Sequence, residues 1–258
     1  MTSSVHGFVV GAFRVAARNL RVWQNFAGAS ALGNFGEPLL YLVALGYGLG
    51  RIVPDLDGMS YAEFIAPGLV LSTVMYSATF ELLFGSYTRL ATQKTFEAVL
   101  ATPISVGELV AGEIIWGGLK ATFGAAVVLL VIRLFGLVPS WQALAVVPLG
   151  FVAGIMFSTM ALVVTALSHR YDSFNFYLTL VVAPMFLFGG VFFPLERMPD
   201  WAGRVAQLLP LTHAVAIARA LVRGTTDAQV FTHLLAMAAF TAVTWIISWR
   251  LMIRRLRV

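Results

Sequence analysis

Long apolar stretches separated by short charged segments dominate the chain. Residues 173 to 195 carry no formal charge, and at about 1.5 Å per helical residue they match a hydrocarbon core of about 30 Å. The same pattern recurs elsewhere, and the predicted spans cover about residues 28–50, 62–83, 107–134, 142–168, 173–195 and 228–249. We therefore expect an all-α integral membrane protein in which residues 1–258 form a single transmembrane domain with six spans.

An amphipathic segment precedes the first predicted span. Its apolar residues recur at helical spacing and its arginines form a separate stripe: Val9, Phe13, Ala16, Leu20 and Trp23 against Arg14, Arg18 and Arg21. This pattern is typical of a helix lying on an anionic membrane surface. Residues 8–24 are therefore predicted to be an interfacial helix, the alternative being a solvated start to the first span.

A second amphipathic segment, residues 196–224, lies between the fifth and sixth spans. Prolines divide it into two helical pieces that are too short to cross a bilayer, with Pro199 in the first turn of one and Thr212 as N-cap of the other. We expect a re-entrant hairpin packed on the outer ends of the neighbouring spans, where it would close a transport path. The residues expected to form this outer gate are Pro194, Pro199, Trp201, Pro210, Thr212 and His213.

Composition supports the membrane assignment and removes several chemistries. The chain is 59% hydrophobic and only 11% charged, with a mean hydropathy of +0.86, whereas soluble proteins carry about 25% charged residues. The absence of cysteine excludes disulfides, thiolate metal sites and thiol catalysis. The net charge of +5 is interpreted through membrane topology, and no nucleic-acid partner is expected.

The distribution of Lys and Arg predicts the orientation. If both termini face the cytoplasm, the inner segments hold more of these residues than the outer ones, as the positive-inside rule requires. The inner set is Arg14, Arg18, Arg21, Arg89, Lys94, Arg170, Arg250, Arg254, Arg255 and Arg257, and the outer set is Arg51, Arg133, Arg197, Arg204, Arg219 and Arg223. Residues 87–105 are then cytoplasmic and residues 196–224 lie outside.

Ionisable residues within the spans are candidates for function, because charge is costly there. Glu37 shares a helix face with Asn34 and Tyr41, so it either borders a substrate path or forms a polar contact between helices. Glu81 ends the second span, and the third contains Glu113 and Lys120 at i, i+7 spacing. Lys120 either extends toward the interface or takes part in the path.

The motifs of common enzymes are absent. The sequence contains no G-x-x-x-x-G-K-[ST] phosphate loop, G-x-S-x-G elbow or H-E-x-x-H zinc motif. Its histidines, His6, His169, His213 and His233, are scattered without metal-ligand spacing. The chain alone is therefore expected not to be an enzyme and to hold no cofactor or metal.

Four segments together carry a family resemblance. They read GNFGEPLLYLVALGYGLG in the first span, TFEAVLATPIS after the second, and FFPLERMPDW and LLPLTHAVAIARAL around the hairpin. In their order they resemble the permease subunit of ABC-2 type exporters, most closely the nodulation protein J group of lipo-oligosaccharide permeases. The resemblance implies a homodimer with two separate cytoplasmic ATPase subunits, which would bind ATP and Mg²⁺.

The resemblance also implies two sets of site residues. The coupling helix that docks on the ATPase maps to Lys94, Thr95, Phe96, Glu97 and Leu100, where Phe96 and Leu100 form an apolar i, i+4 pair that would otherwise face water. In the family the first and fifth spans frame the substrate path. Here the path residues would be Asn34, Glu37, Tyr41, Tyr47, Met185, Phe186, Phe188, Phe192 and Phe193.

The expected function is ATP-driven export across the bacterial inner membrane. An amphiphilic lipo-oligosaccharide would suit the path, since aromatic rings stack on sugars and pack against acyl chains. Alternative cargoes within the family are a hydrophobic drug, an undecaprenyl-linked glycan or polysaccharide, or another lipid. A membrane enzyme or an ion-coupled carrier remains a further alternative, although the chain shows no inverted repeat of the kind carriers contain.

Overall fold

The computed structural model describes residues 5–56, 58–225 and 228–256, with the backbone alone for residues 29–35. Apart from one isolated bridge between Leu56 and Met59, the described chain is helices and their connections. The α-helices are α1 (Val5–Gln24), α2 (Ala27–Tyr41), α3 (Tyr61–Phe80), α4 (Thr95–Leu100), α5 (Val106–Leu134), α6 (Val146–Leu167), α7 (Ser173–Tyr177), α8 (Ala183–Phe188), α9 (Asp200–Ala206), α10 (Pro210–Arg223) and α11 (Ala228–Leu256).

Shorter helical segments of other types continue or connect these helices. The π-helical segments are η1 (Leu42–Gly48), η3 (Glu81–Gly85), η4 (Thr88–Thr92) and η6 (Leu178–Val182). The 3₁₀ segments are η2 (Leu49–Arg51), η5 (Trp141–Ala145) and η7 (Leu195–Arg197). Helical structure is therefore continuous over Ala27–Arg51, and over Ser173–Phe188 through α7, η6 and α8.

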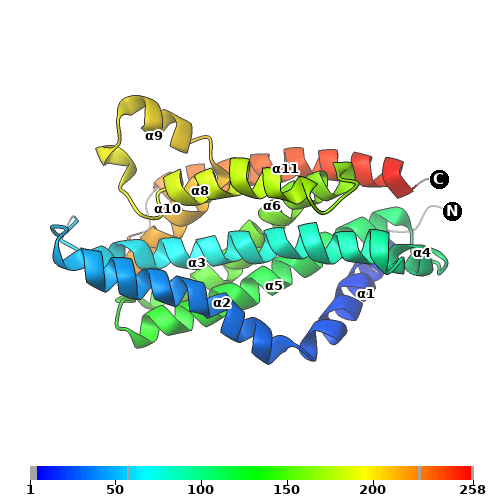
Figure 1. The fold of residues 1–258 in the computed structure, drawn as a ribbon, viewed down its shortest axis with the longest axis horizontal. Coiled ribbons are helices and arrows are strands. Elements are labelled where there is room, and N and C mark those ends of the chain that lie inside the picture. Colours follow the sequence, from blue (N-terminus) through cyan, green and yellow to red (C-terminus); the bar gives the residue numbers. More distant parts are fainter. Residues whose placement is uncertain (1–4, 57, 226–227, 257–258) are drawn as a thin grey trace.

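The long helices lie roughly side by side along the longest axis of the molecule (Figure 1). α5 is central and packs against α1, α3 and α6, while α11 packs against α6 and α10 against both α11 and α3. Both ends of the described chain lie beside α4, and α9 lies at the opposite end (Figure 1). The molecule thus has one end with the termini and α4, and another with the hairpin.

Local sequence signals explain where the two central helices begin. The Ser60 hydroxyl oxygen accepts a hydrogen bond from the Glu63 N–H, and that of Ser105 accepts one from the Glu108 N–H. Each glutamate side chain in turn accepts a hydrogen bond from the backbone N–H of its serine. These capping boxes satisfy N–H groups at the helix starts. Gly112 then allows α1 to approach α5 closely, since a Cβ there would lie 2.5 Å from Val15.

Four described helices are long and apolar enough to cross a membrane: Tyr61–Thr92, Val106–Leu134, Trp141–Leu167 and Ala228–Leu256. A fifth results if α9 and α10, which bend by 89° relative to each other, count as one broken span. Ser173–Phe188 is apolar but shorter. The protein is therefore a multi-helix membrane protein, and the count of six spans stays a prediction.

Three helix ends differ from the predicted bounds, and one of them is the end of the sixth helix, which continues to Leu256 where residue 249 was predicted. The second span continues to Thr92, because Arg89 is paired with buried carboxylates and does not have to face water. The fifth ends at Phe188, because Gly190 adopts a left-handed conformation with φ of 75° that turns the chain away. Hydropathy senses neither ion pairing nor backbone conformation.

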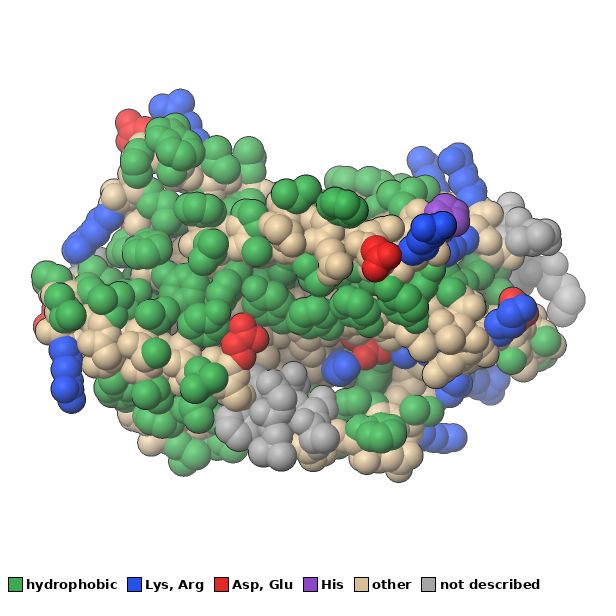
Figure 2. Space-filling model, in the orientation of Figure 1, with side chains coloured by type: hydrophobic (Ala, Val, Ile, Leu, Met, Phe, Trp, Pro, Cys, Tyr) green, Lys and Arg blue, Asp and Glu red, His purple; other side chains and the backbone are tan. Residues whose placement is uncertain are grey.

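The surface between the two ends is largely apolar. Figure 2 shows hydrophobic side chains over the middle of one face, with Lys and Arg side chains mostly near the two ends. Along α11 most apolar side chains are exposed, including Phe231, Leu235, Val243 and Ile246. Such a surface is expected of helices that contact lipid.

α1 covers the predicted amphipathic segment. Ala12, Val15 and Ala16 are buried on its inner face, and Arg14 and Arg21 are exposed. The inner face packs on α5. The position of α1 at a membrane surface stays a prediction.

Candidate functional site: a polar cleft among α2, α3, α5 and α8

A cleft of about 240 Å³ opens among α2, α3, α5 and α8. It combines charged, hydroxyl and aromatic side chains with an apolar wall. Its lining consists of Glu37, Pro38, Tyr41, Leu69, Ser72, Thr73, Tyr76, Ser77, Phe80, Lys120 and Phe186. The first, second, third and fifth predicted spans therefore all contribute to one site.

Glu37 is exposed within the cleft. It lies fourteen residues before Arg51, which ends this continuous helix, so at about 1.5 Å per residue it is about 20 Å from the helix end. Among the described side chains, none forms an ion pair with it. Because an unpaired carboxylate is costly within a bilayer, this position is typical of a functional residue.

Aromatic rings form one wall of the cleft. Tyr41 lies 5.5 Å from Phe186 between ring centroids, and Tyr76 also lies 5.5 Å from Phe186. Phe192 closes the cluster at 4.9 Å from Phe186. These edge contacts fix the rings and leave aromatic surface facing the cleft.

Ser77 is buried in the lining of the cleft, and its hydroxyl forms no hydrogen bond with the described residues. The residue is 7% exposed. Neighbouring hydroxyls differ, since Ser72 donates to the Gly68 carbonyl at 2.8 Å and Thr73 to the Leu69 carbonyl at 3.0 Å. Buried polar groups are usually satisfied, so Ser77 is an unsatisfied hydroxyl in the wall of the cleft.

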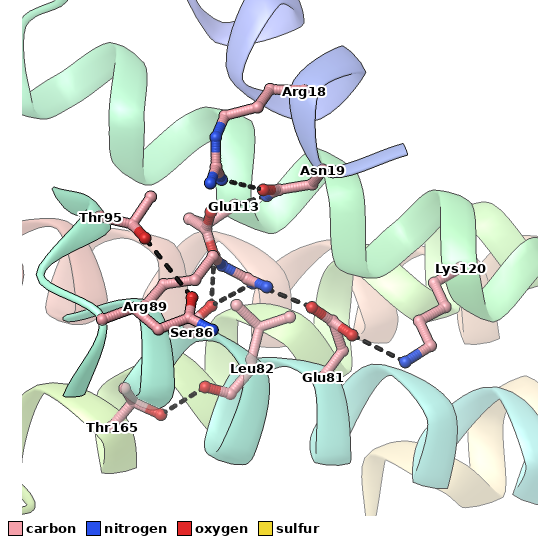
Figure 3. Close-up of polar contacts among 11 residues, drawn as sticks. Arg18, Asn19, Glu81, Leu82, Ser86, Arg89, Thr95, Glu113, Lys120 and Thr165 are labelled. Atoms are coloured by element: carbon pink, nitrogen blue, oxygen red, sulfur yellow. Dashed lines mark hydrogen bonds and ion pairs between the residues drawn. The ribbon is translucent and has the colours of Figure 1, made fainter. Parts of the chain in front are cut away.

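A buried charge network adjoins the cleft (Figure 3). The Lys120 ammonium lies 2.7 Å from Glu81, and Arg89 lies 2.9 Å from Glu81 and 2.6 Å from Glu113. The Glu81 and Glu113 side chains are 8% and 2% exposed. Two acids are thus balanced by two bases, which is the condition for keeping charges buried.

The network continues into α1 (Figure 3). Asn19 donates to Glu113 at 2.7 Å, and Arg18 donates to the Asn19 side-chain oxygen at 2.9 Å. Ser86 also donates to Glu113. These contacts join α1, the part of the second span that follows α3, and α5 next to the cleft.

The predicted path residues do not all meet. Glu37, Tyr41 and Phe186 line the cleft, Phe192 packs on the last two, and Met185 is buried beside Phe186. Phe193 lines a different cavity of about 310 Å³ with Pro194 and Pro199. Tyr47 and Phe188 are exposed and line neither cavity, and the side chain of Asn34 is outside the described ones.

The predicted coupling residues lie on α4 and at its start. Lys94 precedes the helix with a left-handed conformation, and it lies 3.7 Å from Glu97 in an exposed pair. Phe96 is only 1% exposed and packs in a cluster with Leu82 and Leu109. The pair does not need a partner to shield it from water, because the core of the chain already buries Phe96 and partly covers Leu100. The coupling role of these residues stays a prediction.

The outer hairpin has different helix starts from those expected. α10 begins at Pro210, so Thr212 is not its N-cap; the Thr212 hydroxyl instead donates to the Ala206 carbonyl at 2.6 Å. Pro199 is the residue before α9. Trp201 is 72% exposed, whereas much of α10 is buried.

Two histidines that are distant in sequence lie side by side where the hairpin packs on α11. His213 on α10 and His233 on α11 have their Nδ1 atoms 2.9 Å apart. In the described part of the chain, no group of three or more His, Cys, Asp or Glu side chains gathers as metal ligands would. The pair therefore joins two helices.

Sequence reasoning missed Ser77, Tyr76 and the pairing of Arg89. An apolar second span containing several Ser and Thr residues was the available signal for the hydroxyls. The spacing of Glu81 and Arg89, about two helical turns, could have placed both on one helix. Lys120 was singled out, and it reaches Glu81 while also lining the cleft.

The family model for the ABC-2 type transporter matches residues 13–222. The chain belongs to the ABC-2 type transporter family. Nodulation protein J of Rhizobium meliloti (strain 1021) is 35% identical over 239 residues, covering 93% of this chain and 91% of that protein. Nodulation protein J of Rhizobium leguminosarum bv. viciae is 36% identical over 239 residues, with 93% and 92% covered.

A more distant ABC-2 relative is the inner membrane transport permease YadH of Escherichia coli (strain K12). It is 25% identical over 218 residues, covering 83% of this chain and 84% of that protein. The resemblance read from the motifs is thereby confirmed at the level of the family and of its nodulation protein J members. This ABC-2 permease is accordingly a multi-pass protein of the bacterial inner membrane.

Proposed function

We propose that this ABC-2 permease exports an amphiphilic lipo-oligosaccharide or a similar glycolipid. The observation that carries the proposal is the cleft, in which Glu37 and Ser77 offer unused hydrogen-bonding groups next to aromatic rings. Sugar hydroxyls can donate to the carboxylate, exchange a hydrogen bond with the serine and place their apolar faces on the rings. The cleft is smaller than the roughly 300–1,000 Å³ typical of pockets that enclose a drug-sized ligand, so it would hold part of a head group.

The proposed assembly is a homodimer with two cytoplasmic ATPase subunits that bind ATP and Mg²⁺. In that assembly the exposed face of α4, with Lys94, Glu97 and Ala98, would contact the ATPase. Phe96 packs against Leu82 at the inner end of the second span, whose preceding turns line the cleft. Movement of α4 would thus reach the cleft through packed side chains and support alternating access.

Direction follows from the proposed topology, with both termini and α4 in the cytoplasm and the hairpin outside. A hairpin at the outer end would act as the gate. Pro194 and Pro199 line the cavity of about 310 Å³ together with Phe192 and Phe193. Phe192 also touches Tyr41 and Phe186 of the cleft, so the gate and the cleft share a wall.

Inside-out vesicles containing the permease and its ATPase test the proposal. We expect ATP-dependent uptake of an acylated oligosaccharide labelled on its sugar. Ser77→Ala should raise the KM for uptake about threefold or more, because the hydrogen bond to the ligand is lost. The matched control is Ser72→Ala, whose hydroxyl donates to the Gly68 carbonyl and which should change the KM less.

A second cargo is favoured by one feature of the same cleft. An unpaired carboxylate beside aromatic rings can bind a lipophilic organic cation through charge and cation–π contacts. In this case Glu37→Gln would abolish cation export while Ser77→Ala would leave it unchanged. ATP-dependent uptake of such a cation without uptake of the acylated sugar would contradict the lipo-oligosaccharide proposal.

A further inference from the structure

A second polar pocket lies between α1, the inner end of the second span and α5. Its volume is about 410 Å³, and Arg18, Trp23, Phe26, Thr88, Gln93 and Trp116 contribute to its lining. Glu81 also lines this pocket, while its ion-pair partner Lys120 lines the cleft. The ion pair therefore lies between the two sites, and the function proposed for the cleft does not account for this pocket.

Arg18 brings an uncompensated positive charge to the pocket. Among the described residues it forms no ion pair, and its hydrogen bond goes to the neutral Asn19 side chain. The other charges of the lining, Arg89 and Glu81, are engaged in the balanced network. Because Asn19 is itself held by Glu113 at 2.7 Å, the guanidinium of Arg18 is oriented while most of its donors remain available.

Trp23 supplies a second unused donor. Its indole nitrogen is buried and has no hydrogen-bond acceptor within the described part of the chain. The ring is held by Trp116 at 5.9 Å and by Phe123 at 4.9 Å between centroids. The N–H group is thus fixed in place without an acceptor, although a buried donor ordinarily has one.

Part of the pocket lining is apolar and open to the surface. Val22 and Phe26 belong to its lining and are exposed large hydrophobic residues. A group that satisfies the whole pocket must therefore have an anionic, acceptor-rich part and an apolar part. Neither a free anion nor a water-soluble acidic peptide would cover Val22 and Phe26.

We propose that this pocket binds the phosphate head group of an anionic phospholipid. Arg18 would donate two N–H groups to phosphate oxygens, in the geometry that guanidinium and phosphate favour, and the Trp23 indole would donate a third. An acyl chain would extend over Val22 and Phe26. Basic pockets beside membrane helices on the cytoplasmic side are suited to such head groups, and α1 runs from the end that holds α4 and the termini toward the middle of the molecule (Figure 1).

The bound lipid would also have a structural consequence. It would join α1 to the network that holds the second span and α5, since Arg18 is linked through Asn19 to Glu113. The proposal does not depend on which substrate the permease exports. Lipid binding can be measured on the full-length permease without ATP and without transport.

The test measures lipid retention by native mass spectrometry of the purified permease in detergent. Phosphatidylglycerol, phosphatidylcholine and inorganic phosphate are added in separate titrations. We expect one phosphatidylglycerol molecule to bind to each permease more tightly than phosphatidylcholine or inorganic phosphate does. Arg18→Gln should weaken it about tenfold and Trp23→Phe, which keeps the ring, about threefold.

The matched control is Arg21→Gln, which removes an exposed arginine of the same helix that does not line the pocket. It should leave the tightest phosphatidylglycerol in place, and an unchanged elution volume in size exclusion shows that each variant is folded. Equal retention by Arg18→Gln and the unaltered protein would overturn the proposal. So would equal binding of phosphatidylcholine, or displacement of the lipid by an equal concentration of inorganic phosphate.

Discussion

Single residues of the second span determine whether two buried acids remain compatible with the fold. Arg89 is the shared partner, since it contacts both Glu81 and Glu113. Its removal leaves the Glu113 carboxylate without a cation, while Glu81 keeps Lys120. An uncompensated buried charge is far more costly than a missing exposed one.

Replacing Arg89 should therefore destabilise the permease strongly. We expect Arg89→Met to lower the free energy of unfolding by about 3–5 kcal/mol, as breaking buried ion pairs does. Lys94→Met is the control, because its pair with Glu97 is exposed and such pairs contribute about 0–1 kcal/mol. Denaturant unfolding in mixed micelles measures both, and similar losses for the two variants would contradict the assignment.

Arg219 performs a different task at the opposite end. It donates to the Gly190 carbonyl at 2.7 Å, just past the end of α8, and its guanidinium lies 4.0 Å from the centre of the Phe64 ring. A cation near a helix C-terminus interacts favourably with the negative end of the helix dipole. One side chain therefore links α10 to α8 and α3.

Arg219→Gln should loosen this junction. We expect a loss of about 1.5–3 kcal/mol, the range for hydrogen bonds to charged groups. Hydrogen exchange would show the loss as faster exchange over residues 189–198. Arg204→Gln, at an exposed position on α9, should leave that exchange unchanged, and equal exchange in both variants would show that Arg219 does not hold the segment.

Among the short elements, α4 is anchored to the core by one buried residue, and other residues on it or at its start are exposed to solvent. Phe96 faces the core, and Lys94, Glu97 and Ala98 are exposed. A helix of six residues is not stable alone, so the buried ring fixes its position. Docking and anchoring should consequently be separable by mutation.

The double variant Glu97→Lys with Ala98→Glu should fold normally and lose its ATPase. We expect at least about a tenfold weaker complex, because a reversed charge and an added charge disturb a small interface. Copurification measures the complex, and thermal unfolding measures the fold. Phe96→Ala should instead lower thermal stability, so an intact complex in the double variant would place the contact elsewhere.

Two positions on α9 differ in how far the chain itself covers them. Ala206 is buried at the end of α9, whereas Trp201 is exposed in the isolated chain. If the hairpin dips into the bilayer, lipid must cover the exposed apolar face of α9. The difference between the two positions makes this testable.

Single cysteines at these positions report on the hairpin. We expect Ala206→Cys to react slowly with a water-soluble maleimide in detergent and in membranes alike. Trp201→Cys should react slowly in membranes, where lipid covers it, and at least about tenfold faster after the protein is unfolded in denaturant. Fast labelling of Trp201→Cys in intact membranes would show that α9 lies in water and would remove the support for a re-entrant hairpin.

For the whole molecule, hydropathy predicted the helices that rely on continuous apolar runs and failed where pairing or backbone conformation decides. α5, and η5 together with α6, lie close to their predicted spans. The extension to Thr92 required Glu113 from another helix, and the turn after Phe188 required a left-handed glycine. Glu37 could be predicted as a candidate residue because a charge within an apolar span is visible in the sequence. The unused Ser77 hydroxyl could not be predicted, because it depends on how other helices pack around it.

The division of labour between subunits is also a prediction for the whole molecule. The purified permease alone should hydrolyse no ATP, because its sequence contains no phosphate loop. Adding the partner ATPase should restore turnover, measured as phosphate release. Hydrolysis by a permease preparation free of other polypeptides would contradict this prediction.

The π-helical segments η1, η3, η4 and η6 all belong to the helices that line the cleft, and in the described chain α5, α6 and α11 contain none. Each wider turn holds a surplus residue compared with an α-helix. Deleting one residue within η1 or η6 would let the segment revert to α-helix with its two ends still in register. A deletion in α5 would turn everything beyond it by about 100°. Three of the four helices that border the cleft can therefore lose, or shift along their length, one residue without unwinding.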